Sequence, residues 1–250
     1  MDFEGNKTCR AKEVAMMRSP KRKLDPAETA FFSDLQLLLS KEKASLPHDV
    51  SRICAVDAAY QGDNVVAVAS LFDHGRLKEA SLYSGTCSLP YESGLFYLRE
   101  GPFVVQAVKG LKARPQLVCF DAHGAAHPRF RGLATVAGMV LGIPSVGIAK
   151  SLLVGELIPT GGLQKIVYRG RTVGFVNRTN GSRRYWSPGY AVDLKELASL
   201  IRNHTRTCLS AMSHSHMIAT ERLRRPFTAE APPSARRGND EISRRGMIPS

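Results

Sequence analysis

The fold is decided by residues 51–84, which read SRICAVDAAYQGDNVVAVASLFDHGRLKEASLYS. Three runs rich in β-branched and other apolar residues, 51–60, 65–72 and 77–84, are typical of strands. The tetrapeptides QGDN and DHGR between them have the composition of tight turns. Three consecutive strands joined by such short turns predict an antiparallel meander.

Downstream of the meander, helical and strand-like patterns alternate. The expected elements are a helix over 94–112, a strand over 116–121, a helix over 130–141 and a strand over 145–149. Gly142 and Pro144 mark the end of the second helix and the entry of the second strand. This alternation is typical of a parallel βαβ unit. The sequence therefore predicts an α/β fold: a mixed sheet, with an antiparallel meander followed by parallel strands, flanked by helices.

The outer parts of the chain predict further elements. Asp25 as N-cap and Pro26 at the first helical position begin a helix that reaches about residue 44. The remaining expected elements are a hairpin of 166–168 with 172–176, a helix over 193–207 and a second helix near 212–225. The expected organisation is a flexible basic arm (1–24), one folded domain (25–225) and a disordered tail (226–250).

The chain of 250 residues is strongly basic, with 35 Lys and Arg against 22 Asp and Glu and a formal charge of +13. This excess predicts a polyanionic partner such as a nucleic acid. No apolar run approaches the ~18 residues of a membrane span, and the N-terminus lacks a signal-peptide pattern. A cytoplasmic monomer without membrane contact is expected. Five scattered cysteines, none in a CxxC pair, predict reduced thiols.

Three acidic residues stand where a divalent-cation site could be assembled. Asp57 closes the apolar run 53–56, Asp121 closes the run 117–120, and Glu100 lies between them in the sequence. An ionised carboxylate at the end of a buried run is costly to desolvate and is rarely left without a partner. Mg²⁺ prefers such carboxylates together with waters and phosphate oxygens, and Mn²⁺ is a possible substitute. The alternative is an N-cap Asp, a turn Asp and a surface Glu.

A zinc site is a competing interpretation of the nearby histidines. His123 and His127 are four residues apart, and Cys119 is close to them in sequence. Gly124 and Pro128 disfavour a helix here, so the spacing does not place the two imidazoles on one face. No fourth ligand is evident, and zinc is rejected on these grounds.

Four segments carry a resemblance to a known family. They are VDAAY (56–60), PYESGLFYLREGP (90–102), FDAHGAAHPR (120–129) and GIAKSLL (147–153). In this order and spacing they resemble endonuclease V, the deoxyinosine-specific nuclease of the ribonuclease-H-like superfamily. The resemblance covers roughly residues 27–195 and includes the strand order expected above.

The resemblance implies an enzyme of DNA repair that uses Mg²⁺ or Mn²⁺. It would cut the second phosphodiester bond 3′ to a deoxyinosine and leave 3′-hydroxyl and 5′-phosphate ends. By this resemblance Asp57, Asp121 and Glu100 hold the metal, and Lys150 faces the scissile phosphate. There the lysine could stabilise charge that develops during cleavage.

The same resemblance assigns substrate contacts. Tyr91 matches a wedge loop that helps to turn the inosine out of the stack, a step that costs a few kcal/mol. Gly94, Ala122 and Gly132 match positions that line the hypoxanthine pocket. His127 matches a residue of the substrate region. Arg129, beside this stretch, suits a phosphate contact that positions the strand without reading its sequence.

The chain departs from the family pattern at three places. Ala122 stands where the family has Gly, and Tyr190 stands where relatives have His. Near the C-terminus the best register puts Met217 at the position of a further metal-side Asp or His. His216 is adjacent to it, but neighbouring helix positions point about 100° apart, so His216 replaces the ligand only if the register slips.

Three functions remain open from the sequence. The leading one is the deoxyinosine-directed nuclease. The second is another ribonuclease-H-like nuclease, either one that acts on inosine in RNA or a junction resolvase, against which the Tyr91 loop argues. The third is a module that binds inosine-containing strands without cutting them, against which the joint presence of Asp57, Glu100, Asp121 and Lys150 argues.

Overall fold

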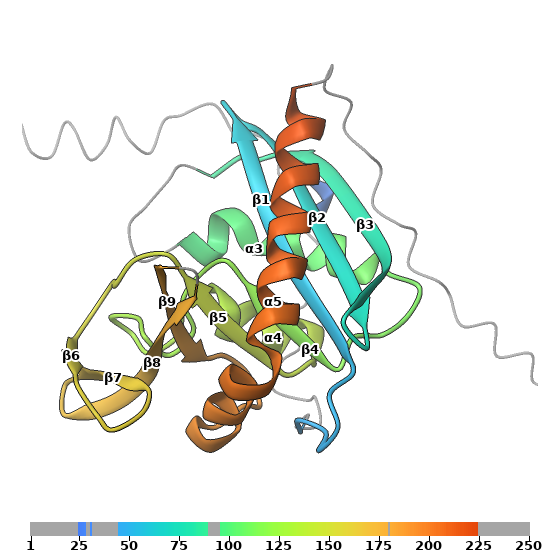
Figure 1. Cartoon of the computed structure of the whole chain (residues 1–250). Helices are drawn as coiled ribbons and strands as arrows, with labels where there is room; N and C mark the ends of the chain where they lie inside the picture. Colours follow the sequence, from blue (N-terminus) through green and yellow to red (C-terminus); the bar gives the residue numbers. More distant parts are fainter. Residues whose placement is uncertain (1–24, 29–30, 32–44, 90–95, 180, 225–250) are drawn as a thin grey trace, which may run out of the picture.

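The computed structural model of the protein describes residues 25–28, 31, 45–89, 96–179 and 181–224. The expected arm and tail lie outside these ranges, as does most of the first expected helix. The described start of that helix is helical at Pro26 and is capped as expected. Figure 1 shows a twisted sheet with one long helix across its front and two shorter helices behind it.

The antiparallel meander is confirmed. It consists of β1 (Arg52–Gln61), β2 (Asn64–Asp73) and β3 (Arg76–Thr86), with β2 paired to both neighbours. Gly62 and Gly75 adopt positive φ in the two connecting turns. A residue without Cβ takes this left-handed conformation at little cost, which is why the turns can be so short.

The parallel part is also confirmed. β4 (Leu117–Phe120) pairs with β1, and β5 (Ser145–Ala149) pairs with β4, both in parallel. The helix α3 (Phe96–Lys109) leads from β3 into β4, and α4 (Leu133–Leu141) connects β4 to β5. α4 begins three residues later than expected because Phe130 has a φ of 57°, which is incompatible with a right-handed helix.

Four further strands extend the sheet. They are β6 (Glu156–Ile158), β7 (Gln164–Tyr168), β8 (Arg171–Thr179) and β9 (Ser182–Pro188). The expected hairpin of β7 and β8 is confirmed, whereas β6 and β9 were not predicted. The described residues form one nine-stranded sheet in the order β3-β2-β1-β4-β5-β9-β8-β7-β6.

The C-terminal helix differs from the expectation of two helices. A single helix, α5 (Leu194–Leu223), runs without interruption. Asp193 and Glu196 form a reciprocal capping box at its start. The thirty residues of α5 contain no Gly or Pro, so nothing in the backbone chemistry ends the helix midway.

The two faces of the sheet carry separate cores. In β1, Cys54 and Val56 pack towards α3 and α4, whereas Ile53 and Ala55 pack towards α5. This alternation of period two places the next odd residue, Asp57, on the α5 face. The described residues include no helix that is long and apolar enough to cross a membrane. Of the five cysteines, the four within the described residues are free and buried, as predicted.

Candidate active site

Three parallel strands bring polar side chains to one edge of the sheet. Val56 of β1 is level with Phe120 of β4, so Asp57 and Asp121 are the next residues on neighbouring strands. Lys150 directly follows β5. Asp57 lies inside β1 and not at its end, because β1 continues for four residues beyond it, paired with β2 alone. The strand edge beside Asp57 is therefore left open where β4 stops.

The side chain of Asp57 contacts the C-terminal helix α5. The residue is 8% exposed, and its Oδ2 lies 2.6 Å from Nδ1 of His216. Met217, which the sequence register placed at this position, is 57% exposed. The expectation for Met217 is therefore wrong, and His216 is the residue that faces the acid.

The buried residue Ser215 explains how α5 is rotated about its own axis. Its hydroxyl donates to the carbonyl of Ala55 at 3.0 Å and lies 2.8 Å from the hydroxyl of Ser70. Both partners belong to the meander strands, so the rotation of α5 about its axis is fixed at this point. The following residue, His216, then lies over Asp57.

Glu100 approaches Asp57 and Asp121 from the opposite face of the sheet. We call these three acids the carboxylate centre. It is the fifth residue of α3 and is only 6% exposed. Burial, together with the negative charges of Asp57 and Asp121, raises the pKa of Glu100 well above its ordinary value. Burial likewise raises the pKa of Asp57, and the charge of Asp121 adds to this rise. The three carboxylates therefore lie close enough to repel one another.

Basic side chains partly compensate this negative centre. The ammonium group of Lys150 forms an ion pair with Oδ2 of Asp121. The imidazole of His216 contacts the carboxylate of Asp57 through Nδ1. Within the described ranges, no three acidic, histidine or cysteine side chains are grouped closely enough to hold a metal ion as they stand.

The donor chemistry nevertheless fits a hard divalent cation. Three carboxylates supply the oxygen ligands that Mg²⁺ and Mn²⁺ prefer. Burial and the neighbouring negative charges raise the pKa values of Asp57 and Glu100, so a nearby cation would stabilise their ionised forms. A cation would relieve that repulsion, with Lys150 and His216 turning aside from the carboxylates.

A pocket of about 330 Å³ opens beside this centre. Asp121 and Lys150 line it together with Ala122, His127 and Gly132. Three of the six residues that the sequence predicted on the substrate side, Ala122, His127 and Gly132, therefore line one pocket. Tyr91 and Gly94 lie outside the described residues. Arg129 does not line the pocket, but its backbone N–H donates to Nδ1 of His127 at 3.2 Å.

Burial favours the neutral form of both pocket histidines. Burial lowers the pKa of His123 to about 4. Burial also lowers the pKa of His127, and the nearby charge of Arg129 contributes. Nδ1 of His123 is buried and has no hydrogen-bond partner among the described residues. The sequence assigned no role to His123, although it lines the same pocket.

The pocket wall is tied to β9 by two hydrogen bonds from backbone N–H groups, one to a side-chain hydroxyl and one to a carbonyl. The N–H of Gly124 donates to the hydroxyl of Ser187 at 2.8 Å, and the N–H of Ala125 donates to the carbonyl of Pro188 at 2.7 Å. Gly132 closes the loop by donating to the carbonyl of Gly124 at 2.9 Å. Because β9 was not predicted, this scaffold was missed as well.

Gly132→Ala should destabilise the protein. An added Cβ would lie 2.2 Å from the carbonyl oxygen of His123, so the backbone itself must move. We expect a loss of about 1–3 kcal/mol in the free energy of unfolding, measured by urea denaturation. Gly161→Ala is the matched control, because its Cβ would meet nothing within 4 Å. Equal stability of the two variants would contradict the tight pocket wall.

Comparison with known proteins identifies the family. The family model described as Endonuclease V matches residues 35–210, which is more than half of the chain. The chain belongs to the endonuclease V family. It is therefore a nuclease, and the resemblance carried by the four sequence segments is confirmed.

Relatives of this endonuclease V support the same conclusion. Endonuclease V of Sulfolobus acidocaldarius is 35% identical over 176 residues, which cover 69% of this chain and 86% of the relative. The crystal structure of endonuclease V from Streptomyces avermitilis is 27% identical, with a TM-score of 0.65, and the match covers 78% and 91% of the two chains. The family match ends at residue 210, so His216 lies beyond it.

A more distant structure shares the fold. Endonuclease V of Ciona intestinalis was crystallised with a 24-mer DNA that contains an inosine followed by a ribo-adenosine. It is 19% identical, with a TM-score of 0.60, and the match covers 77% of this chain and 98% of the other.

Proposed function

We propose that this endonuclease V is a metal-dependent enzyme of DNA repair that recognises deoxyinosine. It hydrolyses the second phosphodiester bond 3′ to that nucleotide and leaves 3′-hydroxyl and 5′-phosphate ends. The observation that carries the proposal is that Asp57 and Asp121 follow paired residues of neighbouring strands and act electrostatically on buried Glu100, beside a pocket that Asp121, His123 and His127 line. The acids supply a place for the cation, and the pocket supplies a place for the base.

The cleavage centre is formed by the three carboxylates and Lys150. Asp57, Glu100 and Asp121 would hold Mg²⁺, or Mn²⁺ in its place. When bound, such an ion lowers the pKa of water and neutralises charge on a phosphate. The side chain of Lys150 is 59% exposed and adjoins the pocket, so it can leave Asp121 for a phosphate oxygen. There its ammonium group stabilises the charge that develops as the bond breaks.

The base site is the pocket beside Asp121. Its volume is in the range of small-molecule pockets. Neutral His123 and His127 can offer hydrogen bonds to an uncharged base edge without attracting the phosphates. Ala122 and Gly132 carry minimal side chains, which lets their main chain approach the base closely.

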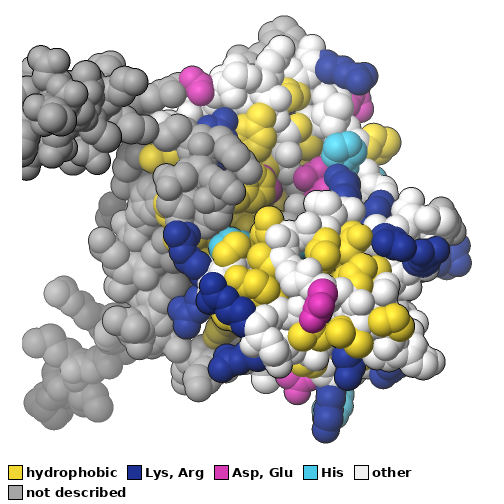
Figure 2. Space-filling view, turned by 90° about the vertical axis from the view of Figure 1, so that its left-hand side faces the viewer, with side chains coloured by type: hydrophobic (Ala, Val, Ile, Leu, Met, Phe, Trp, Pro, Cys, Tyr) yellow, Lys and Arg dark blue, Asp and Glu magenta, His cyan; other side chains and the backbone are white. Residues whose placement is uncertain are grey.

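The partner is a nucleic acid. The chain carries a formal charge of +13, and the Ciona relative was crystallised with inosine-containing DNA. Figure 2 shows Lys and Arg side chains bordering hydrophobic ones on the side of the molecule that lies at the left of Figure 1. Such a surface suits a phosphate backbone with unstacked bases. Arg129 is proposed as one phosphate contact.

An inosine-specific RNA endonuclease is the second candidate. In the Ciona complex the inosine is followed by a ribo-adenosine. A family relative therefore accommodates a ribose at that place, and this chain could select it through the 2′-hydroxyl.

Tyr91→Ala should weaken the discrimination between inosine and ordinary bases. An aromatic wedge lowers the cost of extruding the base, which amounts to a few kcal/mol. We therefore expect the ratio of cleavage rates for inosine-containing and inosine-free strands to fall by about tenfold or more. The ratio is measured with two otherwise identical oligonucleotides. An unchanged ratio would remove the wedge assignment.

The decisive experiment is a cleavage assay on matched oligonucleotides. Single- and double-stranded DNA and RNA, each with one inosine or with guanine at the same position, are incubated with Mg²⁺ or Mn²⁺. We expect cuts only in inosine-containing strands, at the second linkage 3′ to the inosine. Faster cutting of RNA would favour the second candidate. Tight binding without any cut would refute the nuclease assignment for this chain and leave a binding module.

A further inference from the structure

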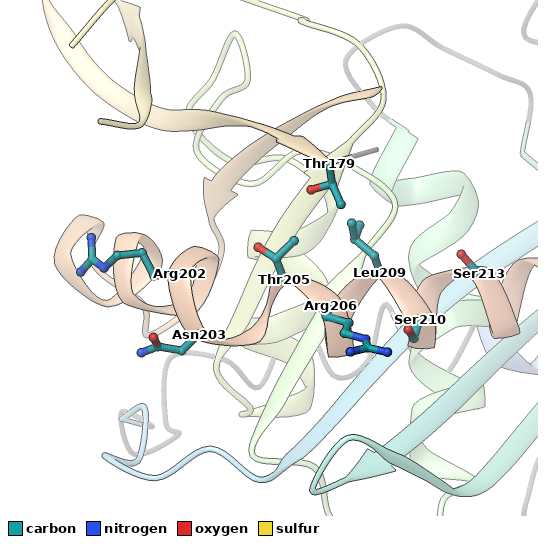
Figure 3. Close-up of a pocket in the computed structure, with 8 residues that line it drawn as sticks. All are labelled: Thr179, Arg202, Asn203, Thr205, Arg206, Leu209, Ser210 and Ser213. Carbon is teal, nitrogen blue, oxygen red and sulfur yellow. The ribbon is translucent and has the colours of Figure 1, made fainter. Parts of the chain in front are cut away.

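A second pocket lies along the C-terminal helix α5, apart from the carboxylate centre. Figure 3 shows it as a groove beside α5, with side chains that follow one another along the helix and Thr179 standing opposite. Its volume is about 810 Å³. Seven of its eight lining residues belong to α5, and Thr179 belongs to the end of β8. We call it the α5 groove.

The lining of the α5 groove suits an anion. Arg202 and Arg206 are exposed on successive turns of the helix, and the remaining polar residues are an amide and hydroxyls. None of the eight lining residues is acidic. α5 carries no carboxylate between Glu196 and Glu221. Two guanidinium groups, together with the hydroxyls of Ser210 and Ser213 further along the helix, are a donor set for phosphate oxygens.

A third arginine, Arg184, lies on the neighbouring hairpin, outside the residues that line the groove. Asn177 of β8 donates from its side-chain amide to the hydroxyl of Thr205 at 3.2 Å, which ties the hairpin of β8 and β9 to α5. Arg184 of β9 is the cross-strand partner of Asn177. Paired residues of an antiparallel ladder project to the same face, so Arg184 also lies on the side of the hairpin that faces α5.

The groove points towards the carboxylate centre. Arg202, Arg206, Leu209, Ser213 and His216 follow one another at intervals of three or four residues, so they form one stripe on α5. The last of them contacts Asp57. At a rise of about 1.5 Å per residue the stripe is roughly 21 Å long, or about six nucleotide steps of a stacked strand.

We propose that the α5 groove binds the sugar–phosphate backbone of the substrate strand as it runs to or from the cleavage centre. Arg202 and Arg206 contact two phosphates several nucleotides away from the inosine. These contacts hold the strand in position and carry no sequence information. The proposal rests on the proposed function, because the strand in the groove is the one that is cut.

The test removes both groove arginines in the full-length protein. Arg202→Ala/Arg206→Ala is compared with Lys109→Ala/Lys112→Ala, which removes two exposed charges at the end of α3, on the other face of the sheet. A fluorescein-labelled inosine oligonucleotide is bound at several salt concentrations in EDTA, so that no cleavage occurs. Circular dichroism checks that both double variants fold like the wild type.

The groove variant should show a weaker dependence of affinity on salt. Each phosphate contact contributes about 0.7–0.9 to the slope of log K against log salt, so the loss of two should reduce the slope by roughly 1.4–1.8. The control variant should keep the wild-type slope. A further oligonucleotide is trimmed to within about two nucleotides of the inosine on the side that the groove binds. On this strand the salt slopes of the groove variant and the wild type should be equal.

The experiment distinguishes a wrong assignment of the α5 groove from a wrong proposed function. Wild-type protein that cuts inosine strands while the groove variant keeps the full salt slope would overturn the groove and leave the function intact. Equal loss in the groove and control variants would also overturn it, because the effect would then be general charge. Wild-type protein that cuts no inosine strand would overturn the proposed function, whatever the groove variant binds.

Discussion

Asp121→Asn and Asp57→Asn each abolish strand cleavage in Mg²⁺ while binding of the inosine strand persists. Asparagine keeps the shape of the side chain but removes the negative charge that a hard cation requires. We expect single-turnover rates to fall by about 10²-fold or more, on the scale of losing one main electrostatic contact in an active site. The rates are measured on an end-labelled duplex with one inosine.

The binding arm of this experiment separates catalysis from recognition. The carboxylates of Asp57 and Asp121 would face a phosphate backbone, so their neutralisation should leave affinity in EDTA unchanged or slightly higher. Asp49→Asn is the matched control, because Asp49 is exposed and lies away from the carboxylate centre. Wild-type cleavage rates in either active-site variant would end the assignment of that carboxylate.

Glu100→Gln raises the stability of the metal-free protein at neutral pH. Glu100 is buried, and Asp57 and Asp121 repel its charge, so its pKa is raised well above the ordinary value. The neutral amide removes this repulsion. Each kcal/mol of relief should raise Tm by about 2–4 °C. Thermal unfolding in EDTA, followed by circular dichroism, measures the change.

The pH dependence of stability has a definite sign. Between the unfolded pKa of about 4.3 for Glu and the raised folded pKa, the folded state binds more protons than the unfolded state. The contribution of Glu100 to stability is therefore full at low pH and is lost as pH rises through the folded pKa. Asp57, with a raised pKa, acts in the same direction. Glu100→Gln should flatten the fall of Tm with rising pH; an identical profile would contradict the mutual repulsion.

Added Mg²⁺ should make the wild type more stable than Glu100→Gln. A ligand that binds the folded state at a hundred times its Kd stabilises it by about 2.7 kcal/mol. The wild type should gain this stabilisation, and Glu100→Gln should gain less, because it lacks one of three carboxylates. If Mg²⁺ shifted the Tm of both proteins equally, Glu100 would not be part of the cation site.

The core of the fold was predictable because its signals are local. In the meander the turns at Gly62 and Gly75 are short and the strands between them are apolar, which leaves few alternatives. The same local signals predicted that Asp57 and Asp121 each follow a buried strand, and the structure shows that these strands are neighbours. The expectation that Glu100 lies near Asp57 and Asp121 also required the family resemblance, because no feature of the α3 sequence indicates it.

The missed strands lack such signals. β6 has only three residues and pairs with β7 alone. β9 begins with Ser182, Arg183 and Arg184, which are polar, and only its later part is buried. Its place beside β5 depends on pairing with a strand about forty positions earlier in the chain. Composition within a short window does not contain that information.

The identity of the residue beside Asp57 was missed for a different reason. The sequence shows that a helix is present near residue 216 but does not show its rotation. That rotation is set by the buried hydroxyl of Ser215, which bonds to Ala55 and Ser70. A shift of one residue turns a helix by about 100°, so the choice between His216 and Met217 depends on this tertiary contact.

The central claim is that Asp57, Glu100 and Asp121 together hold a divalent cation. Titration with Mn²⁺, followed by electron paramagnetic resonance of the free ion, tests it without nucleic acid and without any assay of cleavage. We predict saturable Mn²⁺ binding by the wild type, competition by Mg²⁺, and a large loss of binding in Asp57→Asn and Asp121→Asn. Binding of Mn²⁺ that is equally strong in the wild type and in both variants would contradict the claim.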